Sequence, residues 1–352
     1  MSTKSKLLGG INIAKVLAAE TPLVAKRPPS VPSAQKTSPI DGSYLTAHFN
    51  NFKISPKDAS RAKNFFNSAH VELEWSIYDY LKLPGETEKH EYEKLLRSRP
   101  TEMDAEETEK LEAEVAEMKA KMVKARNDTV LSEVMLLGRC NVGKSSLLNA
   151  LLSPSQLKTP ESYARVRDYA GYTPCLNFYN IGNVLRIVDS PGYGKKGQAW
   201  QGELCFRYLE RRKEMRRCYL LMNPLEGMNQ YDQAILEQLN LKGITYDIVF
   251  TKIDRIRTAE RVKEIQELLD FEPTRELLTV KPRFYFVNSE TGKGGLNTRT
   301  GFEELRYGML ESCGLGSGVK PKRLRGVYDK KMEAQKQARK MKDKEKEKKE
   351  RQ

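Results

Sequence analysis

Residues 138–146 read Gly-Arg-Cys-Asn-Val-Gly-Lys-Ser-Ser, and this stretch constrains the fold of the chain more than any other. The spacing is that of a G-x-x-x-x-G-K-[ST] loop, in which glycines let backbone N–H groups approach phosphate oxygens closely. An apolar run at 133–137 predicts a buried strand before the loop. Residues 144–152 predict a helix after it, whose N-terminus adds partial positive charge. The stretch therefore predicts a strand, a phosphate-binding loop and a helix, in that order.

Two side chains of this loop carry the chemistry that the pattern predicts. We expect Lys144 to reach the β- and γ-phosphates of a bound nucleotide and the Ser145 hydroxyl to ligate Mg²⁺. The expected contacts with the nucleotide are made by Gly138, Arg139, Asn141, Val142, Gly143, Lys144, Ser145 and Ser146. The alternative, a glycine-rich turn without a ligand, is disfavoured because both flanking segments have the required pattern.

A D-x-x-G sequence follows at 189–192, at the end of another apolar run. Behind a phosphate loop, it predicts Asp189 in the second coordination sphere of Mg²⁺ and the Gly192 N–H against the γ-phosphate. A loop held in this way responds to hydrolysis of the nucleotide.

A threonine that contacts Mg²⁺ in the triphosphate state is expected between these two elements. Thr173, in Gly-Tyr-Thr-Pro, is the best candidate because it lies just before the strand predicted at 176–181. Thr159 is a competitor at the wrong distance from that strand, and an ordinary loop threonine is the remaining alternative.

A third element, Thr251-Lys252-Ile253-Asp254, resembles the N/T-K-x-D sequence of GTPases. Asp254 can accept hydrogen bonds from guanine N1–H and N2–H₂. Adenine lacks that donor pair, so a buried aspartate would stay unpaired and ATP would be rejected. Asn288 and Ser289, after the next predicted strand, lie where a backbone N–H would read guanine O6.

Between residues 131 and 315, short apolar runs alternate with amphipathic stretches, which predicts an α/β fold with a mostly parallel sheet covered by helices on both faces. The predicted strands are 133–137, 176–181, 184–188, 218–222, 245–250 and 283–287. The predicted helices are 144–152, 199–217, 231–241, 258–269 and 301–313.

Four parts of the chain are predicted. Residues 1–54 form a disordered start whose basic, Ser- and Pro-rich composition is similar to a mitochondrial transit peptide, with an ordinary disordered terminus as the alternative. Residues 55–130 form a helical extension, helical over 55–83, with an acidic helical insertion over 105–126. Residues 131–317 form the nucleotide-binding domain, and 318–352 a basic, low-complexity tail.

Composition limits the remaining classes of function. The five cysteines form no C-x-x-C pair, which argues against a zinc site or a disulfide framework. No apolar run approaches ~18 residues, so we expect no integral membrane segment. Residues 320–352 hold 15 Lys and Arg against 6 Asp and Glu, and thus +9 of the net charge of +14. Such a tail is expected to bind RNA phosphates, although a merely solvated tail is the alternative.

The order of these elements resembles the EngB family of GTPases. The resemblance lies in Gly-Arg-x-Asn-Val-Gly-Lys-Ser-Ser-Leu-x-Asn at 138–149, Asp-x-Pro-Gly-Tyr-Gly at 189–194, Thr-Lys-x-Asp at 251–254 and the helix at 199–212. It covers about residues 64–314 and departs from the family at Tyr172, where the family has Arg.

The resemblance implies an enzyme that hydrolyses GTP to GDP and phosphate and assists assembly of the large ribosomal subunit, with ribosomal RNA as a partner. Together with the transit-like start it implies a mitochondrial homologue in the matrix, with the cytoplasm as the alternative. We expect a monomer. A GTP-gated ribosome or RNA binding module with negligible turnover is the competing function, and Asp254 disfavours an ATPase.

Tyr193 stands where Ras-like enzymes have a water-orienting Gln, so we expect slow intrinsic hydrolysis. Lys144, Thr173 and Asn141 are the catalytic candidates. Asn141 matches the position that binds K⁺ in related GTPases, where the cation would replace an arginine finger. The alternative is that Asn141 only braces the loop.

Overall fold

A computed structural model describes residues 41–50, 53–99, 104–127, 130–155, 157, 159–164, 174–194, 198–224, 226–256, 259–270, 278, 281–291, 298–316 and 318–323. The transit-like segment at 1–40, Thr173 and the tail beyond Arg323 lie outside these residues. Among the described residues, the strands are β1 (Val71–Ile77), β2 (Ser132–Gly138), β3 (Leu176–Ile181), β4 (Leu185–Asp189), β5 (Met215–Met222), β6 (Tyr246–Phe250) and β7 (Phe284–Phe286). The helices are α2 (Gly42–Asn50), α3 (Pro56–Ser68), α4 (Glu86–Arg97), α5 (Ala105–Asn127), α6 (Lys144–Leu152), α7 (Ala199–Arg211), α8 (Gln230–Leu241), α9 (Ala259–Asp270) and α11 (Phe302–Ser312), with 3₁₀ turns η2 (Tyr80–Lys82) and η3 (Ile253–Arg255).

The strands form one sheet in the order β1-β3-β4-β2-β5-β6-β7. The pairs from β4 to β7 are parallel, and β3 is antiparallel to both β1 and β4. Every residue of β4 and β6 is buried, as expected for strands covered on both faces. The mostly parallel α/β fold predicted from the sequence is confirmed.

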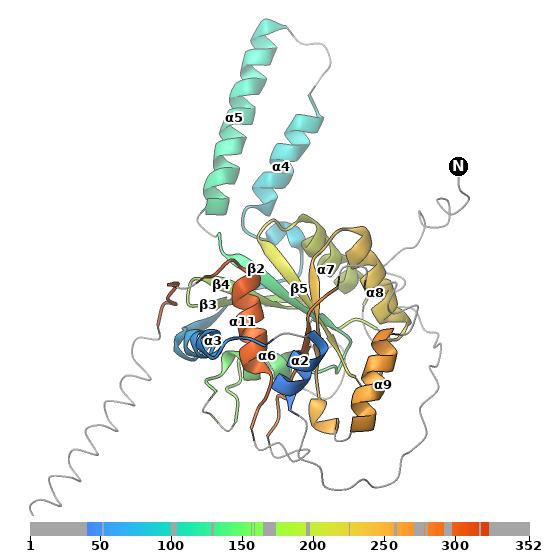
Figure 1. Ribbon diagram of the computed structural model, residues 1–352. Helices are drawn as coiled ribbons and strands as arrows, with labels where there is room; N and C mark the ends of the chain where they lie inside the picture. The colour runs from blue at the N-terminus through green and yellow to red at the C-terminus, as the bar shows by residue number, and fades with distance from the viewer. Residues whose placement is uncertain are drawn as a thin grey trace, which may run out of the picture.

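Helices cover both faces of this sheet (Figure 1). Helices α7, α8 and α9 pack one apolar cluster, to which Leu204 and Ile235 belong. Helices α3, α6 and α11 pack the cluster on the other face, to which Phe66 and Leu305 belong. This arrangement leaves the carboxyl ends of the parallel strands as one open edge, where loops can meet a ligand.

The prediction of one helix over 55–83 is wrong after Ser68. Helix α3 ends there, and β1 then pairs with β3. The sequence Val-Glu-Leu-Glu-Trp-Ser-Ile of β1 alternates apolar and polar residues, which is the period of a strand. The extension is therefore partly an edge strand of the main sheet.

The prediction of disorder across 1–54 is wrong for α2, which packs against β7 and α11. Asn50 exchanges two hydrogen bonds with the backbone of Phe284, at 2.6 and 2.8 Å, and the Phe286 N–H donates to the Thr46 hydroxyl at 3.1 Å. These side chains satisfy backbone groups of β7, which is the edge strand among the described strands.

Two further boundaries differ from the predictions. Helix α7 ends at Arg211 rather than at residue 217, because Arg212 turns into a buried group of carboxylates and β5 begins at Met215. The ordered body also continues past Gly318, since the Lys322 N–H donates to the Gly182 carbonyl at 2.8 Å.

Helices α4 and α5 form a hairpin that projects from the body (Figure 1). The helix predicted over 105–126 is confirmed. Its apolar stripe is only half-buried, and no described side chain of α5 is fully buried. The stripe consists of Leu111, Val115, Met118 and Met122.

Candidate nucleotide-binding site

The phosphate loop connects β2 to α6 at the open edge of the sheet. Gly143, with φ 108°, and Asn141, with φ 61°, adopt left-handed backbone conformations that turn the loop sharply. The side chain of Lys144 is buried, and its Nζ donates to the carbonyls of Gly138 at 2.9 Å and Arg139 at 3.2 Å. The loop therefore folds around its own lysine, as the sequence pattern requires.

Asp189 ends β4 beside Leu136 of β2, directly before the loop. Only 1% of the residue is exposed, and Oδ1 has no hydrogen-bond partner within the described part of the chain. Burial raises the pKa of Asp189 to about 6, and the nearby Lys144 ammonium opposes that shift. Burial also lowers the pKa of Lys144.

An unpaired buried carboxylate oxygen is costly unless a ligand or water satisfies it. Ser145 lies half-buried in the first turn of α6, which starts from the adjacent strand. Carboxylate and hydroxyl oxygens are the donors that Mg²⁺ prefers. The residues present at this edge therefore fit the magnesium site expected from the sequence.

Gly192 of the D-x-x-G loop lies directly against the phosphate loop. A Cβ atom at Gly192 would come within 2.9 Å of the Cys140 Cα, so only glycine fits there. The Cys140 thiol donates to the Gly192 carbonyl at 3.2 Å. The two loops that were predicted to surround the terminal phosphate are in direct contact.

Residues 251–254 also contact the phosphate loop, from the end of β6. The Thr251 hydroxyl donates to the Val142 carbonyl at 2.7 Å. The Lys252 ammonium donates to the Asn141 carbonyl at 2.8 Å, and Lys252 has a left-handed backbone with φ 58°. Asp254 is half-buried in the following turn, η3.

Asn288 and Ser289 follow β7 at the same edge. Asn288 is buried, its Nδ2 donates to the Glu290 carbonyl at 2.5 Å, and its N–H donates to the Thr300 carbonyl at 3.2 Å. Ser289 is half-buried. All the described segments that the sequence assigned to one site thus come together, while Thr173 lies outside the described residues.

Arg139 and Tyr193 both contact Asp232 of α8, which the sequence did not predict. The guanidinium of Arg139 turns toward α8, where its Nε lies 3.4 Å from Asp232 Oδ2. Asp232 also accepts a hydrogen bond from the Tyr193 hydroxyl at 2.7 Å. The only signal in the sequence is the Asn-x-x-Asp spacing of Asn229 and Asp232, which predicts a helix cap.

The phosphate loop, the D-x-x-G loop and the T-K-x-D segment on one edge of a parallel α/β sheet define a P-loop GTPase. A family model described as a 50S ribosome-binding GTPase matches residues 133–252. MIOREX complex component 8 of Saccharomyces cerevisiae is 32% identical over 268 residues, which are 75% of this chain and 76% of that protein. A probable GTP-binding protein EngB of Ruegeria sp. (strain TM1040) is 33% identical over 46% of this chain and 74% of its own length. The chain therefore belongs to the EngB family.

A crystal structure of a probable GTP-binding protein EngB has 19% identity and a TM-score of 0.38, over 52% of this chain and 99% of that one. Within the described residues, no helix is both long and apolar enough to span a membrane.

Proposed function

We propose that the chain binds GTP and hydrolyses it to GDP and phosphate at the carboxyl edge of the sheet. The observation that carries this proposal is the buried carboxylate of Asp189, whose Oδ1 has no partner within the described part of the chain. It lies beside a lysine whose hydrogen bonds, among the described residues, go to two backbone carbonyls. Such groups gain hydrogen bonds when a triphosphate and a cation arrive, so the site is ready for a ligand that the fold itself does not supply.

In this proposal, Lys144 exchanges the carbonyls of Gly138 and Arg139 for the β- and γ-phosphate oxygens. Ser145 would ligate Mg²⁺ directly and Asp189 would hold it from the second coordination sphere, with Thr173 as a further ligand in the triphosphate state. Bound Mg²⁺ supplies positive charge that stabilises the transferring phosphoryl group. The backbone N–H groups of the phosphate loop and the N-terminus of α6 orient the phosphates.

Base selection is assigned to residues 251–254 and 288–289. Asp254 accepts from guanine N1–H and N2–H₂, the Lys252 stem lies along the base, and Ser289 is nearest the N–H that reads guanine O6. The hydrogen bond from Thr251 to Val142 fixes this segment to the phosphate loop, and thus sets the distance between base and phosphate subsites.

Catalysis is expected to be slow without a partner. Tyr193 is buried, so the position after D-x-x-G does not orient the attacking water as the glutamine of Ras-like enzymes does. Asn141 has two roles open to it. It either holds K⁺ beside the phosphates or braces the loop, where its carbonyl already accepts from Lys252.

For the biological role, we propose assembly of the large mitochondrial ribosomal subunit. Three features support it: membership of the EngB family, a yeast relative named as a MIOREX complex component, and a basic tail suited to RNA phosphates. The basic, Ser- and Pro-rich start supports a mitochondrial location. A GTP-gated binding module with negligible turnover is the second candidate, favoured by the absence of Gln after D-x-x-G.

Single-turnover GTP hydrolysis in matched K⁺ and Na⁺ buffers, with and without large ribosomal subunits, separates these functions. The proposal predicts hydrolysis that subunits accelerate. If GTP is hydrolysed faster in K⁺ than in Na⁺, and Asn141→Ala removes that difference in rate, then Asn141 holds a K⁺ ion. Equal rates in both salts leave Asn141 as a brace. Tight GTP binding without turnover in any condition would support the binding module instead.

A further inference from the structure

A buried polar triad joins the D-x-x-G loop, the phosphate loop and helix α8. Its central residue is Asp232, which has no exposed side-chain surface. One carboxylate oxygen accepts from the Tyr193 hydroxyl at 2.7 Å, and the other lies 3.4 Å from Arg139 Nε. A charged group buried this completely is costly unless its partners stay in place, so the three side chains constrain one another.

The backbone repeats the same connection. Arg139 and Tyr193 form a parallel bridge, in which the Cys140 N–H donates to the Tyr193 carbonyl at 3.0 Å and the Tyr193 N–H donates to the Gly138 carbonyl at 3.3 Å. Tyr193 is therefore attached to the phosphate loop through its backbone and to α8 through its side chain. Its neighbour Gly192 has no freedom to move unless Tyr193 moves.

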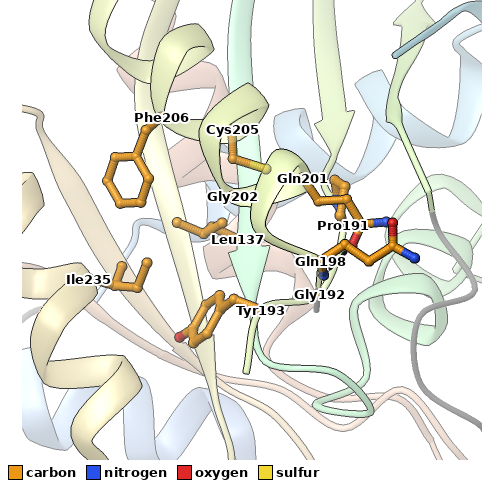
Figure 2. A pocket seen from close by; sticks show the side chains of 10 residues that line it. All are labelled: Leu137, Pro191, Gly192, Tyr193, Gln198, Gln201, Gly202, Cys205, Phe206 and Ile235. Atoms are coloured by element: carbon orange, nitrogen blue, oxygen red, sulfur yellow. Dashed lines mark hydrogen bonds between the residues drawn. The ribbon is translucent and has the colours of Figure 1, made fainter. Parts of the chain in front are cut away.

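The ring of Tyr193 lines a small, mostly apolar cavity together with Leu137, Phe206 and Ile235 (Figure 2). The residue is 5% exposed. Because the ring is buried beside this cavity, the Tyr193 side chain stays away from the phosphates. Its apolar contacts add to the hydrogen bond that it makes with Asp232.

Asp232 is itself held by the start of α8. The Asn229 side chain caps the helix by accepting from the N–H groups of Tyr231 and Asp232, and the Asn229 N–H donates to Asp232 Oδ2 at 3.0 Å. The carboxylate thus projects from a rigid helix end rather than from a loop, and it can fix the position of whatever it binds.

We infer that Asp232 is a positioning residue that, through Tyr193 and Arg139, holds the Gly192 N–H in place for the third phosphate and so sets the affinity for GTP relative to that for GDP. The inference rests on the proposed function, because Gly192 is the proposed γ-phosphate contact. GDP has no γ-phosphate, so loosening Gly192 should weaken GTP and leave GDP nearly unchanged.

The test measures the dissociation constants of GDP and of a non-hydrolysable GTP analogue for Asp232→Asn and Tyr193→Phe. We expect the ratio of GDP to GTP-analogue dissociation constants to fall about tenfold in each variant, as for the loss of one hydrogen bond to a charged group. The double variant should lose no more than either single one, because the residues act as a unit. Tyr193→Phe leaves the cap of α8 intact and serves if Asp232→Asn does not fold.

Two controls separate positioning from a structural role. Glu237→Gln changes an exposed side chain of α8 and keeps both the cap and the triad, and Glu226→Gln removes a largely exposed partner that lies 3.5 Å from Arg139. Both should keep the ratio of the unmodified protein. An unchanged ratio in Tyr193→Phe and Asp232→Asn, or an equal loss in Glu237→Gln, would overturn the inference. Failure of the unmodified protein to bind either guanine nucleotide would instead remove the proposed function itself, and this inference with it.

Discussion

The buried carboxylates at the two ends of the parallel strands differ in how completely they are hydrogen-bonded. At the amino end, the buried Glu133 of β2 accepts from Tyr208 OH at 2.9 Å and Arg212 Nε at 3.0 Å on one oxygen, and from Arg212 Nη2 at 2.9 Å on the other. At the carboxyl end, Asp189 of the neighbouring strand keeps an oxygen without a partner within the described part of the chain. The hydrogen bonds that its neighbour Lys144 makes within the described residues go to backbone carbonyls.

The amino end also anchors the projecting hairpin. Arg212 Nη1 lies 3.4 Å from the Glu86 carboxylate in the first turn of α4 and donates to the Pro84 carbonyl at 3.3 Å. Arg186, from β4, reaches the same Glu133 and stacks over Trp75 of β1 at 4.3 Å. One saturated network thus joins the hairpin, the edge strand and the core.

This difference in the pairing of buried charges indicates which end of the strands stabilises the fold and which end binds a ligand. Removing one partner from a saturated buried network leaves a buried charge unpaired and destabilises the fold. Removing a carboxylate that has an oxygen without a hydrogen bond among the described residues should cost the fold little and ligand binding much. Variants at the two ends of the strands test that contrast.

The largest effect is expected from Lys144→Ala. The phosphates lose the lysine ammonium that is expected to contact their β- and γ-oxygens, so affinity for a GTP analogue should fall at least about 10³-fold, while circular dichroism shows an intact fold. Lys110→Ala, on the exposed surface of α5, is the matched control and should leave affinity unchanged. Retained tight binding in Lys144→Ala would mean that the nucleotide binds elsewhere.

At the amino end, Arg212→Met should lower the free energy of unfolding by about 3–5 kcal/mol, because Glu133 and Glu86 lose a shared cation. Urea denaturation measures the change. The neighbouring Arg211 is exposed, and Arg211→Met should change stability by no more than about 0.5 kcal/mol. Equal stability of the two variants would contradict the assignment of the network to stability.

Two carboxylate-to-amide changes sharpen the contrast on adjacent strands. Glu133→Gln should destabilise the fold by several kcal/mol, on the order expected for a broken buried pair. Asp189→Asn should leave stability within about 1 kcal/mol, because burial already disfavours its charge, and should abolish the Mg²⁺ dependence of GTP binding. Parallel urea titrations and Mg²⁺ titrations check both. A large stability loss in Asp189→Asn would show that this carboxylate is structural.

The smallest effect on either end is expected from cutting the chain after Arg323. Stability and nucleotide affinity should not change, since every segment of both networks lies upstream. RNA or ribosome binding should weaken, with a flatter dependence on salt, because the segment removed is strongly basic. An unchanged salt slope would show that the tail does not contact phosphate.

The sequence predicts most of this molecule where local pattern decides the outcome. Strands β2, β4 and β6 are confirmed within a residue or two, because strands buried on both faces are short apolar runs. The loops at 138–146 and 251–254 meet as expected, since each follows a predicted parallel strand. Helix α2 was missed, because the contacts that hold it come from residues far along the chain. Strand β1 was missed although its alternation of apolar and polar residues is the period of a strand.

The same limit applies to the site. Tyr193 and Asp232 are 39 residues apart, and nothing in either segment alone predicts their hydrogen bond. Glu133 reads as an ordinary polar residue at the start of a strand, and its partners come from α7 and β4. Contacts between buried polar side chains from distant segments can be found only from the three-dimensional structure.

The most direct test of the central claim is equilibrium competition of GTP, GDP and ATP against a fluorescent GDP analogue on the unmodified protein with Mg²⁺. The carboxyl edge, with Asp254 reading the base, predicts that GTP and GDP displace the probe and that ATP binds at least about 10³-fold more weakly, as expected where a polar pair would be left unmatched. Equal displacement by ATP and GTP would contradict the account.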